Sequence, residues 1–381
     1  MHYLDYAATT PMLDEVVEAM TRVFRTDFGN PSSVHGYGRD ARRAIEDARD
    51  AIAAAIGASP AEIVFTGGGT EADNLAIKGA ASKLKASGRH VIVTAFEHHA
   101  VLDPALYLRK QGFDVTVLPV PPSGVVSADA VAGAVRADTI LVSVMTVNNE
   151  IGTIQPIAEI AEATKAVNPN TLVHTDAVQA LGNIPVDLHL LGVDLASFAA
   201  HKLGGPKGVG CLFVRAHVPL EPLLHGGGQE RGIRSGTMNV PGIAGFGVAA
   251  EIAAKEVHAK HDRLLQLRER LLDGLRAAVP DVVVNGDLER RSANNLNICI
   301  PKADGETLIL LLDEAGIACS SGSACASGAM DPSHVLLAIG TSRELAKGSL
   351  RFSLGRDSTE ADVEAALQVL PRVVDRARKV A

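Results

Sequence analysis

Short apolar runs alternate with helical patterns through the first half of the chain, and this alternation is the feature that most limits its fold. The runs have the length and β-branched content of buried strands. They are "EIVFT", "HVIVTA", "DVTVLPV", "TILVSVMTV" and "TLVHTDA". Segments with helical spacing, such as "TEADNLAIKGAASKLKA" and "IAEIAEATKAV", follow them. The order predicts an α/β fold with a mostly parallel sheet, covered by helices on both faces, and a ligand at the carboxyl ends of the strands.

The pattern changes at about Glu251, where a long charged helix begins. The strand-like runs "DVVVNGD" and "NNLNICI" and the helical run "GETLILLLDEAG" come after it. A chain of 381 residues suits about two domains. We expect a large α/β domain over residues 13–255, and a smaller α+β domain formed by residues 1–12 and 256–381. Two early helices are predicted over Asp14–Phe24 and Gly38–Ile56.

Charge and hydropathy limit the classes of partner that the chain can have. The formal net charge of −8 argues against direct nucleic-acid binding, which needs clustered lysine and arginine. No run of about 18 uncharged apolar residues occurs, and the first residues lack the basic and apolar regions of a signal peptide. We therefore expect a cytoplasmic protein that has no membrane partner.

The four cysteines do not form a disulfide framework, and reduced thiols are expected. Cys319 and Cys325 are too far apart in sequence for a CxxC pair, so a metal site would need a distant ligand such as His334. We predict no metal. Cys211 and Cys299 lie in apolar strand-like runs and are expected in the core.

The segment "FTGGGTEADN" suggests how an anion could be held. Gly67, Gly68 and Gly69 follow a strand-like run and precede a helix, so backbone N–H groups and the helix N-terminus can face a phosphate. A plain glycine-rich turn with Thr70 as helix N-cap is the alternative. The spacing is neither GxGxxG nor GxxxxGK[ST], which disfavours a dinucleotide or a triphosphate.

An acid and an amine complete the candidate site. Asp176 follows the run "TLVHT", and Lys202 ends the small, partly apolar segment "ASFAAHK". A buried lysine loses its proton readily and is then a nucleophile for carbonyls, while an acid can keep a pyridine nitrogen protonated. With the phosphate cradle, this combination predicts pyridoxal phosphate. Taken singly, Asp176 could be a turn residue and Lys202 a surface residue.

The chain resembles the pyridoxal-phosphate cysteine desulfurases of the NifS/IscS type, in the class V aminotransferase family. The resemblance covers nearly the whole chain. It rests on "YLDYAATTP", "GNPSSVHGYGR", "TGGGTEADNLAI", "EHHAVL", "VNNEIGTIQPI", "HTDAVQALG", "AAHKLGGPKGVG", "HGGGQERGIRSGT", "SSGSACASG" and "GSLRFSLGR". It implies a fold type I pyridoxal-phosphate enzyme with a seven-stranded-type sheet, a homodimer, and L-cysteine as substrate.

The resemblance also implies a role for each matching residue. Those expected to contact the cofactor are Lys202, which carries it covalently, Asp176 at the pyridine nitrogen, His98 stacked on the ring, Asn149 and Gln179 at the substrate or ring hydroxyl, Gly69, Thr70 and His201 at the phosphate, and Thr237 reaching the phosphate from the partner subunit. Those expected to hold the substrate carboxylate are Arg351 and Asn30, with Asn149 nearby. Many relatives have Ser or Thr where this chain has Ala199, so one phosphate contact is missing.

The expected reaction removes sulfur from L-cysteine, giving L-alanine and a persulfide on Cys325. Sulfur would pass to an acceptor protein of unknown identity, for iron-sulfur cluster assembly, tRNA thiolation or other sulfur trafficking. The small, polar loop "SSGSACASG" suits an accessible thiol, although a surface loop with an incidental cysteine has the same composition. Two enzymatic alternatives are an aminotransferase and a selenocysteine lyase. A third is a binding or scaffold protein that carries sulfur or a cluster on Cys319 and Cys325.

Overall fold

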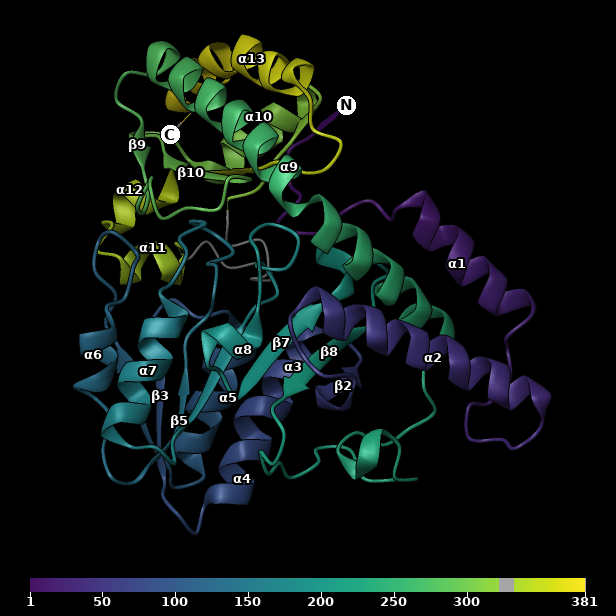
Figure 1. Cartoon of the computed structure of the whole chain (residues 1–381). Coiled ribbons are helices and arrows are strands. Elements are labelled where there is room, and N and C mark those ends of the chain that lie inside the picture. The colour runs from purple at the N-terminus through teal and green to yellow at the C-terminus, as the bar shows by residue number, and fades with distance from the viewer. Residues whose placement is uncertain (322–331, 381) are drawn as a thin grey trace.

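A large sheet lies at the centre of the protein, in a computed structural model that describes residues 1–321 and 332–380 (Figure 1). Within these residues the sheet has seven strands in the order β2-β8-β7-β6-β5-β3-β4. β8 runs antiparallel to β2 and β7, and the other neighbours are parallel. The predicted mostly parallel sheet is confirmed. Its strands are β2 (Ile63–Thr66), β3 (His90–Thr94), β4 (Asp114–Leu118), β5 (Thr139–Ser143), β6 (Leu172–Asp176), β7 (Leu195–Ala199) and β8 (Gly210–Val214).

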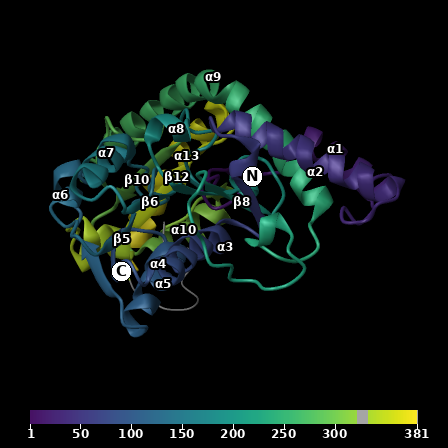
Figure 2. The same cartoon turned by 60° about the horizontal axis from the view of Figure 1, so that its bottom comes forward.

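Helices cover both faces of this sheet, as Figure 2 shows. Successive strand residues point to opposite faces, so Leu172 joins one core and Val173 the other. The first face carries α3 (Gly69–Asn74), a π-helical turn (Leu75–Gly79), α4 (Ala80–Leu84) and α5 (His99–Lys110). The second face carries α2 (Gly36–Ala55), α7 (Ile157–Val167), α8 (Leu188–Leu191) and the start of α9 (Val240–Ala278). α1 (Asp14–Arg25) packs on α9, and α6 (Ala128–Ala132) packs on α7.

A second, smaller hydrophobic core lies at the top of Figure 1. An antiparallel sheet in the order β12-β10-β9 supports it, and the N-terminal β1 pairs with β11. Its elements are β1 (His2–Tyr3), β9 (Val283–Val284), β10 (Asn295–Cys299), α10 (Gly305–Glu314), β11 (Ile317–Ala318), β12 (Ser349–Ser353) and α13 (Glu360–Arg378). The short helices α11 (His334–Ala338) and α12 (Arg343–Lys347) contact the larger core. The division into domains at residue 255 stays a prediction.

Helix α9 runs without a break from the larger core into the smaller one. It begins at Val240, so the expectation that it begins near Glu251 is wrong. Glycines in its first turns obscured the helical pattern. Gly247 is required there, because a Cβ at this position would lie 2.6 Å from the Cα of Ala48 on α2.

Candidate active site

Asp176 and Lys202 lie at the same edge of the large sheet. Asp176 is the last residue of β6, and Lys202 ends the 3-10 turn η3 (Ala200–Lys202) that follows the parallel neighbour β7. The Asp176 carboxyl is buried and accepts a hydrogen bond of 2.9 Å from the backbone N–H of Val178. Burial raises the pKa of Asp176, while the nearby His98 and Lys202 act to lower it. Asp176 and Lys202 therefore lie near one another, and their contacts with a cofactor ring stay a prediction.

The N-terminal segment supplies two hydrogen-bond acceptors to Lys202. The Lys202 Nζ donates to the carbonyl oxygens of Ala7 at 2.6 Å and Ala8 at 2.8 Å. Thr10 fixes this segment, since its hydroxyl donates to the His201 carbonyl and accepts from the Gly204 N–H. Sequence reasoning missed this role, because alanine carbonyls carry no signal in a sequence.

His98 stands at the N-cap of α5. Its Nδ1 accepts a hydrogen bond of 3.1 Å from the Ala100 N–H, which places the ring proton of a neutral imidazole on Nε2. Burial lowers the pKa of His98, and the Asp176 carboxylate opposes that shift. A neutral imidazole close to Asp176 suits the predicted position against the cofactor ring.

Gln179 also reaches this region, and Asn149 contacts Arg351 through its carbonyl oxygen. The Oδ1 of Asn149 is buried and has no hydrogen-bond partner among the described residues. A buried amide oxygen without a partner costs free energy, so this atom fits a site built for a ligand. Gln179 donates through Nε2 to the carbonyl oxygen of Ala7 at 2.9 Å, the same oxygen that Lys202 contacts.

The glycine-rich segment forms one wall of an open cavity. The cavity is lined by Ala8, Thr9, Gly67, Gly68, Gly69, Thr70, Glu71, Asn74, His201, Lys207, Gly208 and Val209. Gly68 has a φ of 148°, which side chains rarely adopt, and a Cβ on Gly69 would lie 2.8 Å from Val178 Cγ2. α3 begins at Gly69, with Gly68 rather than Thr70 in the N-cap position. The alternative of Thr70 as N-cap is therefore wrong.

His201 connects this cavity to Lys202, its neighbour in the chain. Its Nδ1 lies 3.1 Å from the hydroxyl oxygen of Thr9. Burial, followed by the charges of Lys202 and Lys207, lowers the pKa of His201 to about 4. The ring is therefore neutral near pH 7 and offers one N–H donor.

Arg351 is buried on β12, with 3% of its surface exposed. It donates to the carbonyl oxygen of Asn149 at 2.9 Å and to Asp5 Oδ1 at 2.7 Å. Its buried Nε has no partner among the described residues. Arg351 is thus no surface ion pair, and it keeps an N–H donor beside Asn149.

Two further acids are buried near Asp176. Glu97 accepts from the Thr94 hydroxyl at 2.5 Å and from the Met145 N–H at 3.0 Å through Oε1, while its buried Oε2 has no partner within the described ranges. Burial raises the pKa of Glu97 to about 8. Burial also raises the pKa of Asp73, and the Asp176 charge adds to that effect. Sequence reasoning singled out neither acid as part of the site.

Asn30 and Thr237 line a different hollow. It is formed by Val23, Phe24, Phe28, Gly29, Asn30, Pro31, Thr237, Met238, Asn239, Val240 and Pro241. These two residues do not line the open cavity that includes His201, and they do not line the separate pocket that includes Lys202. The structure therefore brings Asn30 together with Thr237.

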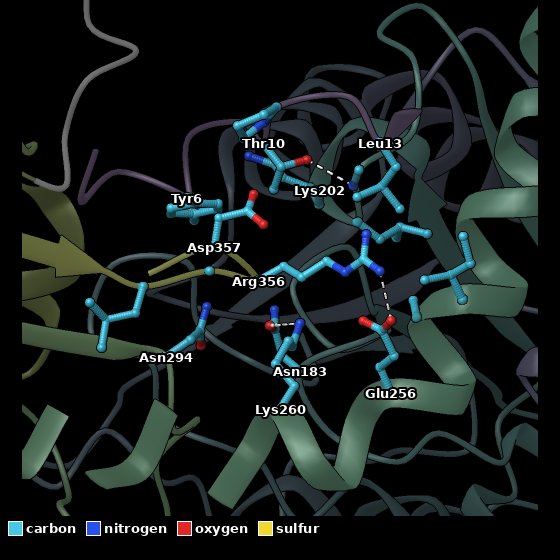
Figure 3. A pocket seen from close by; sticks show the side chains of 17 residues that line it. Tyr6, Thr10, Leu13, Asn183, Lys202, Glu256, Lys260, Asn294, Arg356 and Asp357 are labelled. Atoms are coloured by element: carbon cyan, nitrogen blue, oxygen red, sulfur yellow. Dashed lines mark hydrogen bonds and ion pairs between the residues drawn. The ribbon is translucent and has the colours of Figure 1, made fainter. Parts of the chain in front are cut away.

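A second pocket adjoins Lys202 between the two cores (Figure 3). There the Lys260 Nζ donates to Asn183 Oδ1 at 3.1 Å, and the Asn183 amide donates to the Gln179 carbonyl at 3.0 Å. Arg356 pairs with Glu256 at 2.8 Å on the same side of the pocket. Burial lowers the pKa of Lys260 to about 8. Nothing in the sequence around Lys260 indicated this environment.

The described cysteines are all buried. Cys211 and Cys299 lie in the cores as predicted, and Cys319 packs in the smaller core. Burial raises the pKa of Cys319 to about 12. Cys325 lies outside the described residues. Within residues 1–321 and 332–380, no group of three or more His, Cys, Asp or Glu side chains could hold a metal ion, and no helix is long and apolar enough to cross a bilayer.

The chain is similar to known proteins in both sequence and structure. Residues 2–366 match the family model described as aminotransferase class-V. The chain is 49% identical over 378 residues to a protein named cysteine desulfurase IscS from Dictyoglomus turgidum, an alignment covering 99% of this chain and 95% of that one. A solved structure titled NifS-like protein matches with a TM-score of 0.93 and 42% identity, covering 99% of this chain and 100% of the other. A structure titled SspA in complex with cysteine matches with a TM-score of 0.81 and 37% identity, covering 93% and 99%.

Proposed function

The chain belongs to the aminotransferase class-V family and is a cysteine desulfurase, and we propose that Lys202 holds its pyridoxal phosphate. The observation that carries the proposal is the position of Lys202 beside Asp176, at the edge of the sheet next to the glycine cradle. The identity of 49% to a cysteine desulfurase, over 99% of this chain, supports the reaction.

The residues present fit pyridoxal phosphate. A Cβ on Gly69 would collide with Val178, so the backbone there is open only because it is glycine, as a phosphate cradle requires. The buried Oδ1 of Asn149, which has no partner among the described residues, can accept a hydrogen bond from the ligand. Asp176 would face the ring nitrogen, and His98 the ring. When bound, the cofactor supplies an electron sink for the bonds at the α-carbon of the amino acid.

The residues around the cofactor have separate tasks. The Lys202 amine, once released by the substrate, can remove the α-proton and later return a proton to the product. The guanidinium of Arg351 is fixed by Asp5 and the Asn149 carbonyl, and it has the planar fork that suits a carboxylate. We assign the substrate carboxylate to Arg351. Whether Asn30 also contacts it stays a prediction.

The sulfur step balances between substrate and protein. L-cysteine and one protein thiol give L-alanine and a persulfide: the Cβ–S bond of the substrate and the S–H bond of the protein thiol break, while a sulfur–sulfur bond forms on the protein and a C–H bond forms at Cβ. We assign this thiol to Cys325. Cys319 is poorly suited, because it is buried and its thiol has a pKa of about 12.

A second copy of the chain is the proposed partner. Large apolar side chains are exposed at Phe24, Phe28, Val34 and Tyr37. Phe24 and Phe28 border the hollow that contains Thr237. Contiguous exposed apolar surface marks an interaction site, and Thr237 would reach the partner's phosphate cradle from this surface. The acceptor of the sulfur and a location in the cytoplasm stay predictions from the sequence.

The decisive test is product analysis with L-cysteine. The protein should release L-alanine and, with a reductant, an equal amount of sulfide. Transfer of the amino group to an added 2-oxo acid without sulfide would support an aminotransferase. Alanine formed from L-selenocysteine but not from L-cysteine would support a selenocysteine lyase. A protein that forms no alanine from either would be a scaffold.

A further inference from the structure

We propose that Thr9 and Lys207 complete the phosphate cradle in place of the hydroxyl that Ala199 lacks. This inference rests on the proposed binding of pyridoxal phosphate. Both residues line the same cavity as Gly67, Gly68 and Thr70. They come from two segments that are far apart in the sequence. Thr9 lies between β1 and α1, and Lys207 lies between β7 and β8.

Residue 199 abuts the cradle but offers no hydrogen bond. Ala199 ends β7, and a Cβ on Gly69 would lie 3.5 Å from the Ala199 methyl group. A hydroxyl here would therefore stand beside the glycine backbone. The alanine leaves that wall apolar, so a dianionic phosphate needs another donor.

Thr9 places a hydroxyl in this cavity. The hydroxyl of Tyr3 donates to the Thr9 carbonyl at 2.8 Å, which holds the backbone. The Thr9 hydroxyl oxygen lies 3.1 Å from Nδ1 of His201. When the neutral His201 ring donates its one proton to that oxygen, the Thr9 hydroxyl directs its own proton to an anion, and this contact takes the place of a direct hydrogen bond from His201 to the phosphate.

Lys207 adds the positive charge. The acid in the cavity wall, Glu71, accepts from the N–H of the cradle residue Gly67 at 2.7 Å and pairs with Arg234 at 2.8 Å, so the Gly67 N–H is used by Glu71 and the phosphate needs other donors. Arg234 thus offsets Glu71, and the charge of Lys207 remains for the phosphate. That charge is already felt at His201, where it acts to lower the pKa. A lysine is a common point-charge partner of phosphate.

The test compares two ligands that differ only by the phosphate. Affinities of the cofactor-free protein for pyridoxal phosphate and for pyridoxal are measured by absorbance titration. The Lys207→Gln change should weaken pyridoxal phosphate binding by about tenfold, and Thr9→Val by about fivefold. Pyridoxal affinity should stay within about twofold in both variants, because pyridoxal has no phosphate to lose contact with.

Matched variants sharpen the result. Thr9→Ser and Lys207→Arg keep the donor and the charge, so both should bind pyridoxal phosphate like the parent, as should the surface control Lys83→Gln. Adding Ala199→Ser to the Lys207→Gln variant should recover part of the lost affinity. Equal losses for both ligands, or no loss in Lys207→Gln and Thr9→Val, would overturn the inference. A parent protein that binds neither ligand would instead contradict the proposed function.

Discussion

Lys202 donates a hydrogen bond of 2.6 Å to the carbonyl oxygen of Ala7, the same oxygen that accepts from the side chain of Gln179. The catalytic amine and a predicted ring contact are therefore both fixed by a segment that lies 195 and 172 residues earlier in the chain, respectively. Lys202 should be the point of covalent attachment. Borohydride treatment of the holoenzyme should fix the cofactor to Lys202, and the Lys202→Ala variant should lose this linkage.

The control for that experiment is Lys260, which shares a pocket with Lys202 and has a pKa lowered by burial to about 8. Because burial makes its amine easier to deprotonate, Lys260 is a competitor for an aldehyde. Lys260→Ala should keep the reducible linkage. Peptide mapping that finds the cofactor on Lys260 in the parent protein would refute the assignment.

Arg351→Lys tests the substrate carboxylate. A lysine keeps the charge but loses the planar fork, so the KM for L-cysteine should rise by about tenfold or more while the absorbance of the bound cofactor stays unchanged. Arg356→Lys, which alters a partly exposed ion pair, should leave KM within about twofold. Equal KM values in the two variants would remove Arg351 from the substrate site.

Cys325→Ser should keep cofactor binding but abolish alanine and sulfide production, whereas Cys319→Ser should retain most of the activity. The reason is that Cys319 is buried and its pKa of about 12 leaves almost no thiolate at neutral pH. Mass spectrometry after incubation with L-cysteine should place the additional sulfur on the Cys325 peptide. Sulfur mapped to Cys319 would reverse the assignment.

Mixed dimers test whether Thr237 acts across an interface. In a dimer of Lys202→Ala and Thr237→Ala chains, one site would contain an intact Lys202 and an intact Thr237 only if the two residues come from different chains. Activity should then recover to about half of the parent value per dimer. Mixed dimers that stay as impaired as the two single variants would place Thr237 in the site of its own chain.

Glu97 makes the stability of the cofactor-free protein depend on pH. Its pKa rises from an ordinary 4.5 to about 8 in the folded state, so the folded state holds a proton that the unfolded state has lost between these values. The contribution of Glu97 is thus present at low pH and disappears as pH rises. Relative to Glu97→Gln, the parent should lose stability from about pH 5 to pH 8, with a slope of at most about 1.4 kcal/mol per pH unit. Urea unfolding of both proteins across this range measures the difference, and parallel curves would contradict the prediction.

The proximity of Asp176 and Lys202 was predictable, because each follows a strand and parallel neighbours end at one edge of a sheet. The alternating pattern likewise predicted the sheet itself. The start of α9 was not predictable, since its glycines serve close packing on α2 and break the apolar period. The contacts of Ala7 with Lys202 and of Asn183 with Lys260 depend on tertiary structure alone. A local pattern cannot reveal a backbone acceptor that arrives from a distant segment.

Helix α9 has 39 residues and therefore a length of about 58 Å, with side chains in both hydrophobic cores. The helix is continuous. If the half that packs in the smaller core unfolds, the half that packs against the sheet therefore loses its C-terminal support. The cores should consequently unfold together, as a single cooperative transition in calorimetry. The thermal stability of the glycine-rich cradle at residues 67–69 would thus depend on packing contacts in the smaller core, although the cradle itself does not belong to that core.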